Sequence, residues 1–213
     1  MKIAKTPICD FVKRYRDINA VRLHMPGHKG KNALGCEEID ITEIDGADEF
    51  FAPEGIIKQS EVEASLIFGC PTYYSASGST SAIQAMLYLI ASYGAAKGEK
   101  PLILAARNAH RAFVNAAMLL KIDTEWLYPD NAESYHSCKI SADSLAAAID
   151  NSRRKITAVY ITSPDYLGNI ADIESIAKVC KKRGVTLAVD NAHGAYLKFL
   201  PSSCHPIDLG ADI

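Results

Sequence analysis

Apolar and polar positions alternate in the second half of the chain so that strands and helices are predicted in turn. Short, nearly continuous apolar runs are typical of strands buried on both faces of a sheet, and segments with apolar residues at helical spacing separate them. The predicted strands cover residues 102–106, 124–128, 156–162 and 185–189, and the predicted helices between them cover 111–121, 142–149 and 173–183. This alternation indicates an α/β fold with a mostly parallel sheet flanked by helices on both faces.

Two helices are predicted between residue 46 and the first of these strands. Ser60 and Glu63 form a capping box that opens a helix running to Phe68. The segment 73–80 leads into a longer helix with apolar residues at helical spacing. Residues 1 to about 45 show no sustained periodicity, so we divide the chain into an N-terminal extension, 1–45, and a large domain, 46–213.

The end of the chain enters what resembles a new apolar segment. Residues 210–213 read Gly-Ala-Asp-Ile, and a strand that starts there would lack its partners and its following helix. We therefore expect the large domain to be incomplete at its C-terminus and the chain to be a fragment.

Composition narrows the classes of protein that fit this pattern. The 23 basic and 25 acidic residues nearly cancel, which argues against a nucleic-acid or polyanion binder. The apolar stretch 82–91 is too short to span a bilayer, and residues 1–19 lack the apolar core of a signal peptide. The six cysteines include no C-x-x-C pair and no close Cys/His grouping, so we expect free thiols and no metal site. We predict a soluble cytoplasmic protein.

Candidate chemistry follows the strand predicted at 185–189. Ligands in open α/β sheets bind beyond the carboxyl ends of the strands, which is where Asp190 and His193 lie in this sequence. The carboxylate of Asp190 can hold a protonated heteroaromatic nitrogen, and the small side chain of Ala192 leaves room for a flat ring. The alternative is an ordinary strand-end aspartate that caps the next segment.

Other polar groups are predicted at the start of a helix and after two further strands. The run Ser77-Gly78-Ser79-Thr80 opens the long helix, and a helix start rich in small hydroxyl residues favours phosphate binding. Simple N-capping by one hydroxyl is the alternative, but it leaves the other small residues unexplained. His110 and the loop 163–168 follow two further strands. These groups are predicted to meet in one crevice.

A loop near the N-terminus carries several charged and ring side chains. The segment 22–30 contains one proline, two glycines, two histidines, Arg22 and Lys29, which suit an anion site or the wall of a substrate cleft. The alternative, favoured by chemistry alone, is a solvated polar turn.

Taken in order, these segments resemble the ornithine/lysine/arginine decarboxylases. The resemblance is carried by residues 23–30, 77–80, 107–110 and 189–194 and extends over essentially the whole chain. It implies the aspartate-aminotransferase-like architecture, fold type I, with residues 46–213 as an incomplete large domain that binds pyridoxal 5′-phosphate. It also implies a basic amino acid as substrate, a lyase that releases CO₂, a place in polyamine biosynthesis, and a homodimer.

The resemblance assigns roles residue by residue. Asp190 would pair with the protonated ring nitrogen of the cofactor. An opposite charge at contact distance raises the pKa of such a nitrogen by about 1–3 units and so keeps it protonated. The remaining roles are phosphate binding by Gly78, Ser79 and Thr80, ring stacking by His110, packing on the other ring face by Ala192, and a position beside the cofactor for His193. His193 and His110 are the catalytic candidates.

The sequence departs from the family pattern at several places. Glu is common where this chain has Asn191, Asn where it has Ser77, and Lys-Ser where it has Arg111-Ala112. The Schiff-base lysine of the family follows the segment matching 209–213 and so is absent from the chain, and Lys198 is not at its place. The resemblance therefore implies that the chain alone is inactive and leaves the choice among arginine, lysine and ornithine open.

Two other functions remain open. The Asp190 and phosphate elements also occur in aminotransferases and lyases of fold type I, and a fragment of such an enzyme is the first alternative. The other is a non-catalytic interaction module of the same fold.

Overall fold

The computed structural model describes residues 5–31, 33–131 and 136–213, and its contacts divide the chain into two compact units. The first unit covers residues 1–76 and the second residues 77–213. The sequence pattern placed a boundary between residues 45 and 46, within the first unit. A helix that the sequence pattern assigns to the large domain, α2 (Ile56–Phe68), therefore belongs with the N-terminal residues.

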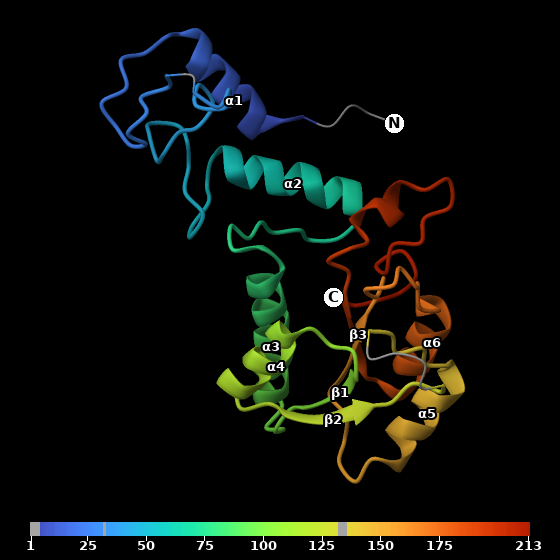
Figure 1. Ribbon diagram of the computed structural model, residues 1–213. Helices are drawn as coiled ribbons and strands as arrows, with labels where there is room; N and C mark the ends of the chain where they lie inside the picture. The colour runs from blue at the N-terminus through green and yellow to red at the C-terminus, as the bar shows by residue number, and fades with distance from the viewer. Residues whose placement is uncertain (1–4, 32, 132–135) are drawn as a thin grey trace. The chain divides into compact units, whose positions relative to one another are not determined.

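The second unit is built on a sheet of four parallel strands in the order β2-β1-β3-β4 (Figure 1). The strands are β1 (Leu102–Ala106), β2 (Asp123–Leu127), β3 (Ala158–Thr162) and β4 (Thr186–Asp190). All four predicted strands are present. The bounds of β1 agree with the prediction, and the others differ by one or two residues. The α/β fold class is confirmed.

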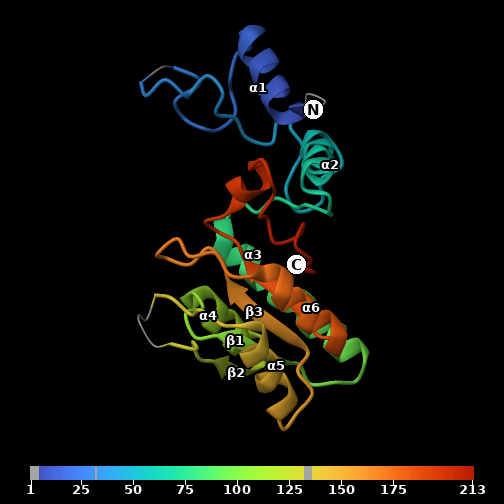
Figure 2. The ribbon, with the colours of Figure 1, turned by 90° about the vertical axis from the view of Figure 1, so that its right-hand side faces the viewer.

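Two helices cover each face of this sheet, as the turned view also shows (Figure 2). On one face, α3 (Gly78–Ala96) and α4 (Arg111–Leu119) pack against Ile103, Ala105, Ala158, Tyr160 and Ala188. On the other face, α5 (Ala142–Asn151) and α6 (Ile173–Arg183) pack against larger aliphatic residues of the same strands. Because successive side chains of a strand point to opposite faces, each strand contributes to both cores.

The strand order locates the position where a ligand is expected. The chain passes from β1 to β2 through α4, and then crosses over β1 through α5 to reach β3. The direction of winding thus changes between β1 and β3. In open α/β sheets the crevice beyond the carboxyl ends of the strands at such a point is the usual ligand site.

The first unit contains α1 (Pro7–Asp17) and α2, and α2 begins earlier than predicted. The capping box at Ser60 is wrong, because Ser60 lies inside the helix and its hydroxyl hydrogen-bonds the hydroxyl of Tyr74 at 2.9 Å. The start of α2 is held instead by the carboxylate of Asp48, which accepts the N–H groups of Gly55 and Ile57, each at 2.9 Å.

The last residues of the chain extend the sheet by hydrogen bonding. After the short 3₁₀ helix η1 (Ala195–Phe199), the N–H of Ile213 donates to the carbonyl of Leu187 at 3.2 Å. The N–H of Val189 donates to the carbonyl of Ile213 at 2.9 Å, which completes a parallel bridge to β4. Within the described ranges, no helix has the length and apolar character needed to cross a membrane.

Candidate functional site

Asp190 is the last residue of β4 and its side chain is buried, with 6% of the residue exposed. It lies two residues beyond Ala188 and therefore on the same face of the sheet as α3 and α4. Its Oδ2 accepts the hydroxyl of Tyr160 at 2.9 Å, and its Oδ1 accepts the N–H of Ala192 at 3.3 Å. No cationic side chain among the described residues pairs with this carboxylate.

A buried carboxylate without a cation is costly unless a positive group meets it. The two neutral donors satisfy part of its hydrogen-bonding capacity and leave its charge uncompensated. A protonated heteroaromatic nitrogen is a group that fits this position, because it is both cationic and a hydrogen-bond donor. Ala192 and His193, which follow it in the chain, are exposed.

The start of α3 has the features expected of a phosphate site. Ser77 stands at the N-cap but its side chain makes no capping hydrogen bond, so capping does not explain its hydroxyl. Gly78 adopts a φ of +68°, a left-handed conformation that favours glycine. Ser79 and Thr80 are exposed in the first turn, where the positive helix end favours an anion.

His110 follows β1 and caps α4. Its Nδ1 accepts the N–H of Ala112 at 3.2 Å, which places the proton of a neutral imidazole on Nε2. The ring is half-buried. Capping fixes the orientation of the imidazole at the edge of the sheet where Asp190 also ends its strand, and it is compatible with the stacking role that remains a prediction.

His193 lies in the segment after β4 and is near the loop that follows β3. The centroid of its ring is 5.7 Å from that of Tyr166. These two segments approach very closely at Gly194, where an added Cβ would lie 2.0 Å from Oδ1 of Asn191 and 2.5 Å from Cδ of Pro164. The backbone supports the same approach, since the N–H of Ser163 donates to the carbonyl of Asp190 at 3.0 Å.

Charged and ring side chains of the loop 22–30 contact other residues of the first unit. The guanidinium of Arg22 donates to the carbonyl of Glu37 at 3.0 Å and lies 5.0 Å from the centre of the Tyr15 ring. The hydroxyl of Tyr15 hydrogen-bonds Nε2 of His24 at 2.7 Å. These contacts engage the side chains of Arg22 and His24, and they favour the polar turn over the anion site.

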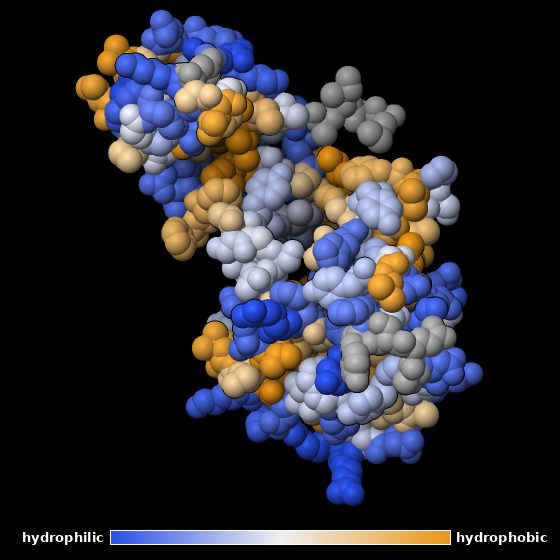
Figure 3. Space-filling model, viewed as in Figure 1, coloured by the Kyte–Doolittle hydropathy of each residue, from blue (hydrophilic) through white to orange (hydrophobic). Residues whose placement is uncertain are grey.

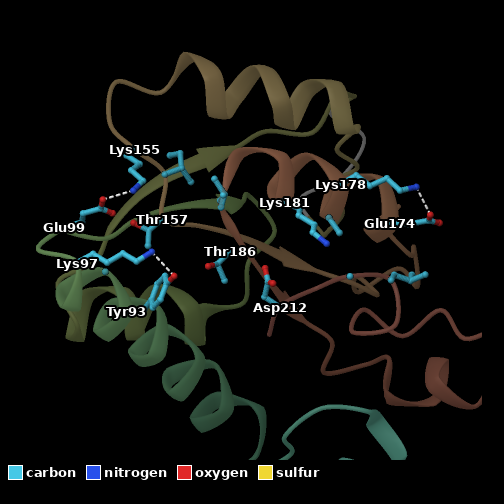
Figure 4. Close-up of a pocket in the computed structure, with 17 residues that line it drawn as sticks. Tyr93, Lys97, Glu99, Lys155, Thr157, Glu174, Lys178, Lys181, Thr186 and Asp212 are labelled. Atoms are coloured by element: carbon cyan, nitrogen blue, oxygen red, sulfur yellow. Dashed lines mark hydrogen bonds and ion pairs between the residues drawn. The ribbon is translucent and has the colours of Figure 1, made fainter.

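A cavity of about 500 Å³ lies at the other end of the strands, near the residues that begin β3 and β4 (Figure 4). It is lined by several lysines, and three of them have partners: Lys155 contacts Glu99 and Lys178 contacts Glu174, each at 2.6 Å, and Lys97 contacts the hydroxyl of Tyr93 at 2.7 Å. None of the predicted site residues lines it. The candidate site therefore remains at the carboxyl ends of the strands, away from this cavity.

Tyr160 is not among the site residues predicted from the sequence. The signal was present, because a tyrosine in the middle of a fully buried strand needs a partner for its hydroxyl. The partner depends on strand register, which the hydrophobic pattern does not give. Asp190 lies one strand away and two residues further along than Ala188, the register partner of Tyr160.

Comparisons with known proteins agree with the fold. The arginine decarboxylase of Bacillus subtilis (strain 168) is 30% identical over 227 residues, and the match covers 98% of this chain and 44% of that protein. The chain thus spans less than half the length of the curated relatives that it matches.

Solved structures share the architecture. Mouse CSAD in its apo form matches 73% of this chain and 36% of its own, with a TM-score of 0.58 and 15% identity. A SepCysS–SepCysE N-terminal domain complex matches 79% of this chain and 43% of its own, with a TM-score of 0.59 and 19% identity. These matches show a fold type I architecture.

The family model described as "Orn/Lys/Arg decarboxylase, major domain" matches residues 6–212, which is nearly the whole sequence. The resemblance inferred from the sequence motifs is confirmed, and with it pyridoxal 5′-phosphate as the cofactor implied by the family and the fold. The chain belongs to the Orn/Lys/Arg decarboxylase family and contains sequence of its major domain.

Proposed function

We propose that this chain provides the ring-nitrogen and phosphate contacts for pyridoxal 5′-phosphate in a decarboxylase that acts on a basic amino acid. The observation that carries the proposal is the buried Asp190 carboxylate, which has neutral donors and no cation among the described residues. Family membership supports the reaction class, and the arginine decarboxylases among the relatives make arginine the first substrate to test.

In this proposal the residues of the chain bind and orient the cofactor. Asp190 holds the proton on the ring nitrogen, because separating the buried carboxylate from a cation is unfavourable. The start of α3, with Gly78, Ser79 and Thr80, receives the phosphate, while His110 and Ala192 flank the ring. When bound, pyridoxal phosphate supplies the electron acceptor for the bond that breaks as CO₂ leaves. His193 is assigned a place beside the cofactor, and assembly as a homodimer is part of the same proposal.

Lys198 is assigned a structural role and not the Schiff-base role. Its Nζ lies 2.6 Å and 2.8 Å from the two carboxylate oxygens of Asp208. A lysine held in this way donates its N–H groups to a carboxylate, whereas the Schiff-base role requires an amine that is free to attack a carbonyl. Borohydride treatment in the presence of pyridoxal phosphate is therefore expected to leave Lys198 unlabelled, and a stable adduct there would contradict the assignment.

The binding proposal is tested by titrating the chain with pyridoxal phosphate. Asp190→Asn removes the negative charge with little change of shape and is expected to weaken binding at least tenfold, or about 1.4 kcal/mol. Asp150→Asn is the matched control, since Asp150 pairs with Arg183 on the surface and its loss should leave binding unchanged. Equal affinities of wild type and Asp190→Asn would overturn the proposal and favour the non-catalytic module.

The reaction class is tested on a full-length protein that joins this chain to the family's Schiff-base lysine and is loaded with pyridoxal phosphate. Release of labelled CO₂ from arginine, lysine or ornithine, abolished by Asp190→Asn, is the expected result. Transamination or elimination products without CO₂ would show instead that the protein is another fold type I enzyme.

A further inference from the structure

We propose that Tyr160 is a positioning residue for Asp190, and that its hydroxyl fixes the carboxylate in the orientation that receives the ring nitrogen of pyridoxal phosphate. The inference rests on the proposed cofactor site. It adds a residue of β3 that acts through Asp190 and does not itself touch the cofactor.

The position of Tyr160 follows from the residues that flank it in the sheet. Its register partners are Ala105 on β1 and Ala188 on β4, so small side chains stand on both sides of it on the face covered by α3 and α4. This leaves space for a ring that is itself fully buried. The hydroxyl reaches along the sheet to Oδ2 of Asp190 at 2.9 Å.

The ring is also held from the helix side. The centroid of Phe113 on α4 lies 4.4 Å from that of Tyr160. Phe113 stands three residues after His110, the residue that caps α4, so one helix supports both the imidazole and the tyrosine ring. The hydroxyl of Tyr160 therefore has a fixed place and a fixed direction.

A tyrosine is chemically suited to this role. A lysine or arginine would neutralise Asp190 and compete with a cationic ring nitrogen, whereas a phenol donates a hydrogen bond and leaves the negative charge in place. Burial and, to a smaller extent, the negative charge of Asp190 raise the pKa of Tyr160 far above its ordinary value. The hydroxyl therefore keeps its proton. With Oδ1 accepting the N–H of Ala192, both oxygens of Asp190 are oriented.

The test compares pyridoxal phosphate with its 1-deaza analogue, in which a C–H group replaces the ring nitrogen. Wild-type chain is expected to prefer pyridoxal phosphate. Tyr160→Phe keeps the ring and removes the hydroxyl, and it should reduce that preference roughly tenfold while leaving the affinity for the analogue unchanged. A general structural defect would weaken both ligands alike. Tyr93→Phe, at the far end of α3, is the matched control and should change neither affinity.

The outcomes separate this inference from the proposed function. If wild-type chain shows no preference between the two ligands, the cofactor site itself is wrong. If wild type shows the preference and Tyr160→Phe retains it in full, the cofactor site stands and the role of Tyr160 is overturned. In an Asp190→Asn background, Tyr160→Phe should have no further effect on the preference.

A measurement on the wild type keeps the inference testable if Tyr160→Phe does not fold. A hydroxyl proton hydrogen-bonded to a buried carboxylate should give a slowly exchanging NMR signal. Titration with pyridoxal phosphate is expected to shift this signal, and titration with the deaza analogue to shift it much less. Equal shifts, or none with either ligand, would overturn the positioning role.

Discussion

Gly194 shows how a single residue fixes the geometry of the candidate site. A methyl group at this position would lie 2.0 Å from Oδ1 of Asn191 and 2.5 Å from Cδ of Pro164, well inside van der Waals contact. Gly194→Ala must therefore separate the segment after β4 from the loop after β3. We expect a loss of about 1–3 kcal/mol in the free energy of unfolding, as for other overpacked sites, measured by urea denaturation.

Gly94→Ala is the matched control for this prediction. Its added Cβ would meet the carbonyl oxygen of Glu99 at 3.4 Å, an ordinary contact, and alanine is favoured over glycine inside the helix α3. We expect Gly94→Ala to be neutral or slightly stabilising. If both variants unfold at the same urea concentration as the wild type, the close approach at Gly194 is not needed for stability.

The site residues predicted from the sequence are those whose position depends only on adjacent residues of the chain. Asp190 and His110 were predicted as site residues because each follows a buried strand, and parallel strands bring such positions to one edge. Tyr160 and Gly194 were missed because their importance depends on neighbours from other segments. The hydroxyl of Tyr160 meets a residue of the adjacent strand, and Gly194 meets a proline from the preceding loop.

At the scale of elements, a helix end that depends on adjacent residues was predicted correctly, and one that depends on a more distant residue was not. Asp172 caps α6 by accepting the N–H of Ser175 at 3.1 Å, and Gly184 ends that helix with a φ of +64°, so α6 has the predicted bounds, 173–183. These signals are local. The start of α2 was predicted wrongly because its cap, Asp48, reaches the helix across an intervening loop and resembles no capping box.

The capping of α2 by Asp48 makes its stability depend on pH. Partial burial alone would raise the pKa of Asp48, but the N–H groups of Glu54, Glu49, Gly55 and Ile57 outweigh it and lower the pKa to about 2. A carboxyl group with a lower pKa in the folded state stabilises that state above its unfolded pKa, about 3.9. The stabilisation is lost as the pH falls from about 4 through 2.

Asp48→Asn is expected to destabilise α2 at neutral pH, because an amide accepts these hydrogen bonds without a charge and offers one oxygen where the carboxylate offers two. The measurement is amide hydrogen exchange in the first turns of α2, compared between wild type and variant. The difference should be present at pH 6 and should shrink toward pH 2, where wild-type Asp48 begins to be protonated. A difference that stays constant over this range would show that the charge of Asp48 plays no part.

The whole molecule distributes its buried apolar residues unevenly between the two units. Among the described residues of the first unit, only Ala47 and Ile57 are buried and hydrophobic, whereas the second unit holds two extended cores, one on each face of its sheet. Large apolar side chains are exposed in the first unit, including Val21, Leu23 and Phe51. Apolar surface is also visible on the space-filling view, where it is coloured orange (Figure 3).

This distribution predicts that the two units open with different free energies. Burial of apolar surface is the main favourable term in folding, so a unit with few buried apolar residues resists local opening less. In native-state hydrogen exchange we expect the amides of β1, β3 and β4 to be the most protected and those of α1 and α2 to exchange through openings of lower free energy. Protection of α1 and α2 equal to that of β3 would contradict this expectation.

A core variant makes the comparison specific to one unit. Leu187 is fully buried in the core beneath α5 and α6, and Leu187→Ala should remove about 2–5 kcal/mol from the stability of that core. If the first unit opens independently, the protection of β3 and β4 should fall in this variant while that of α1 and α2 stays the same. An equal loss of protection in both units would show that they unfold together, because exchange in α1 and α2 would then require the opening of the sheet.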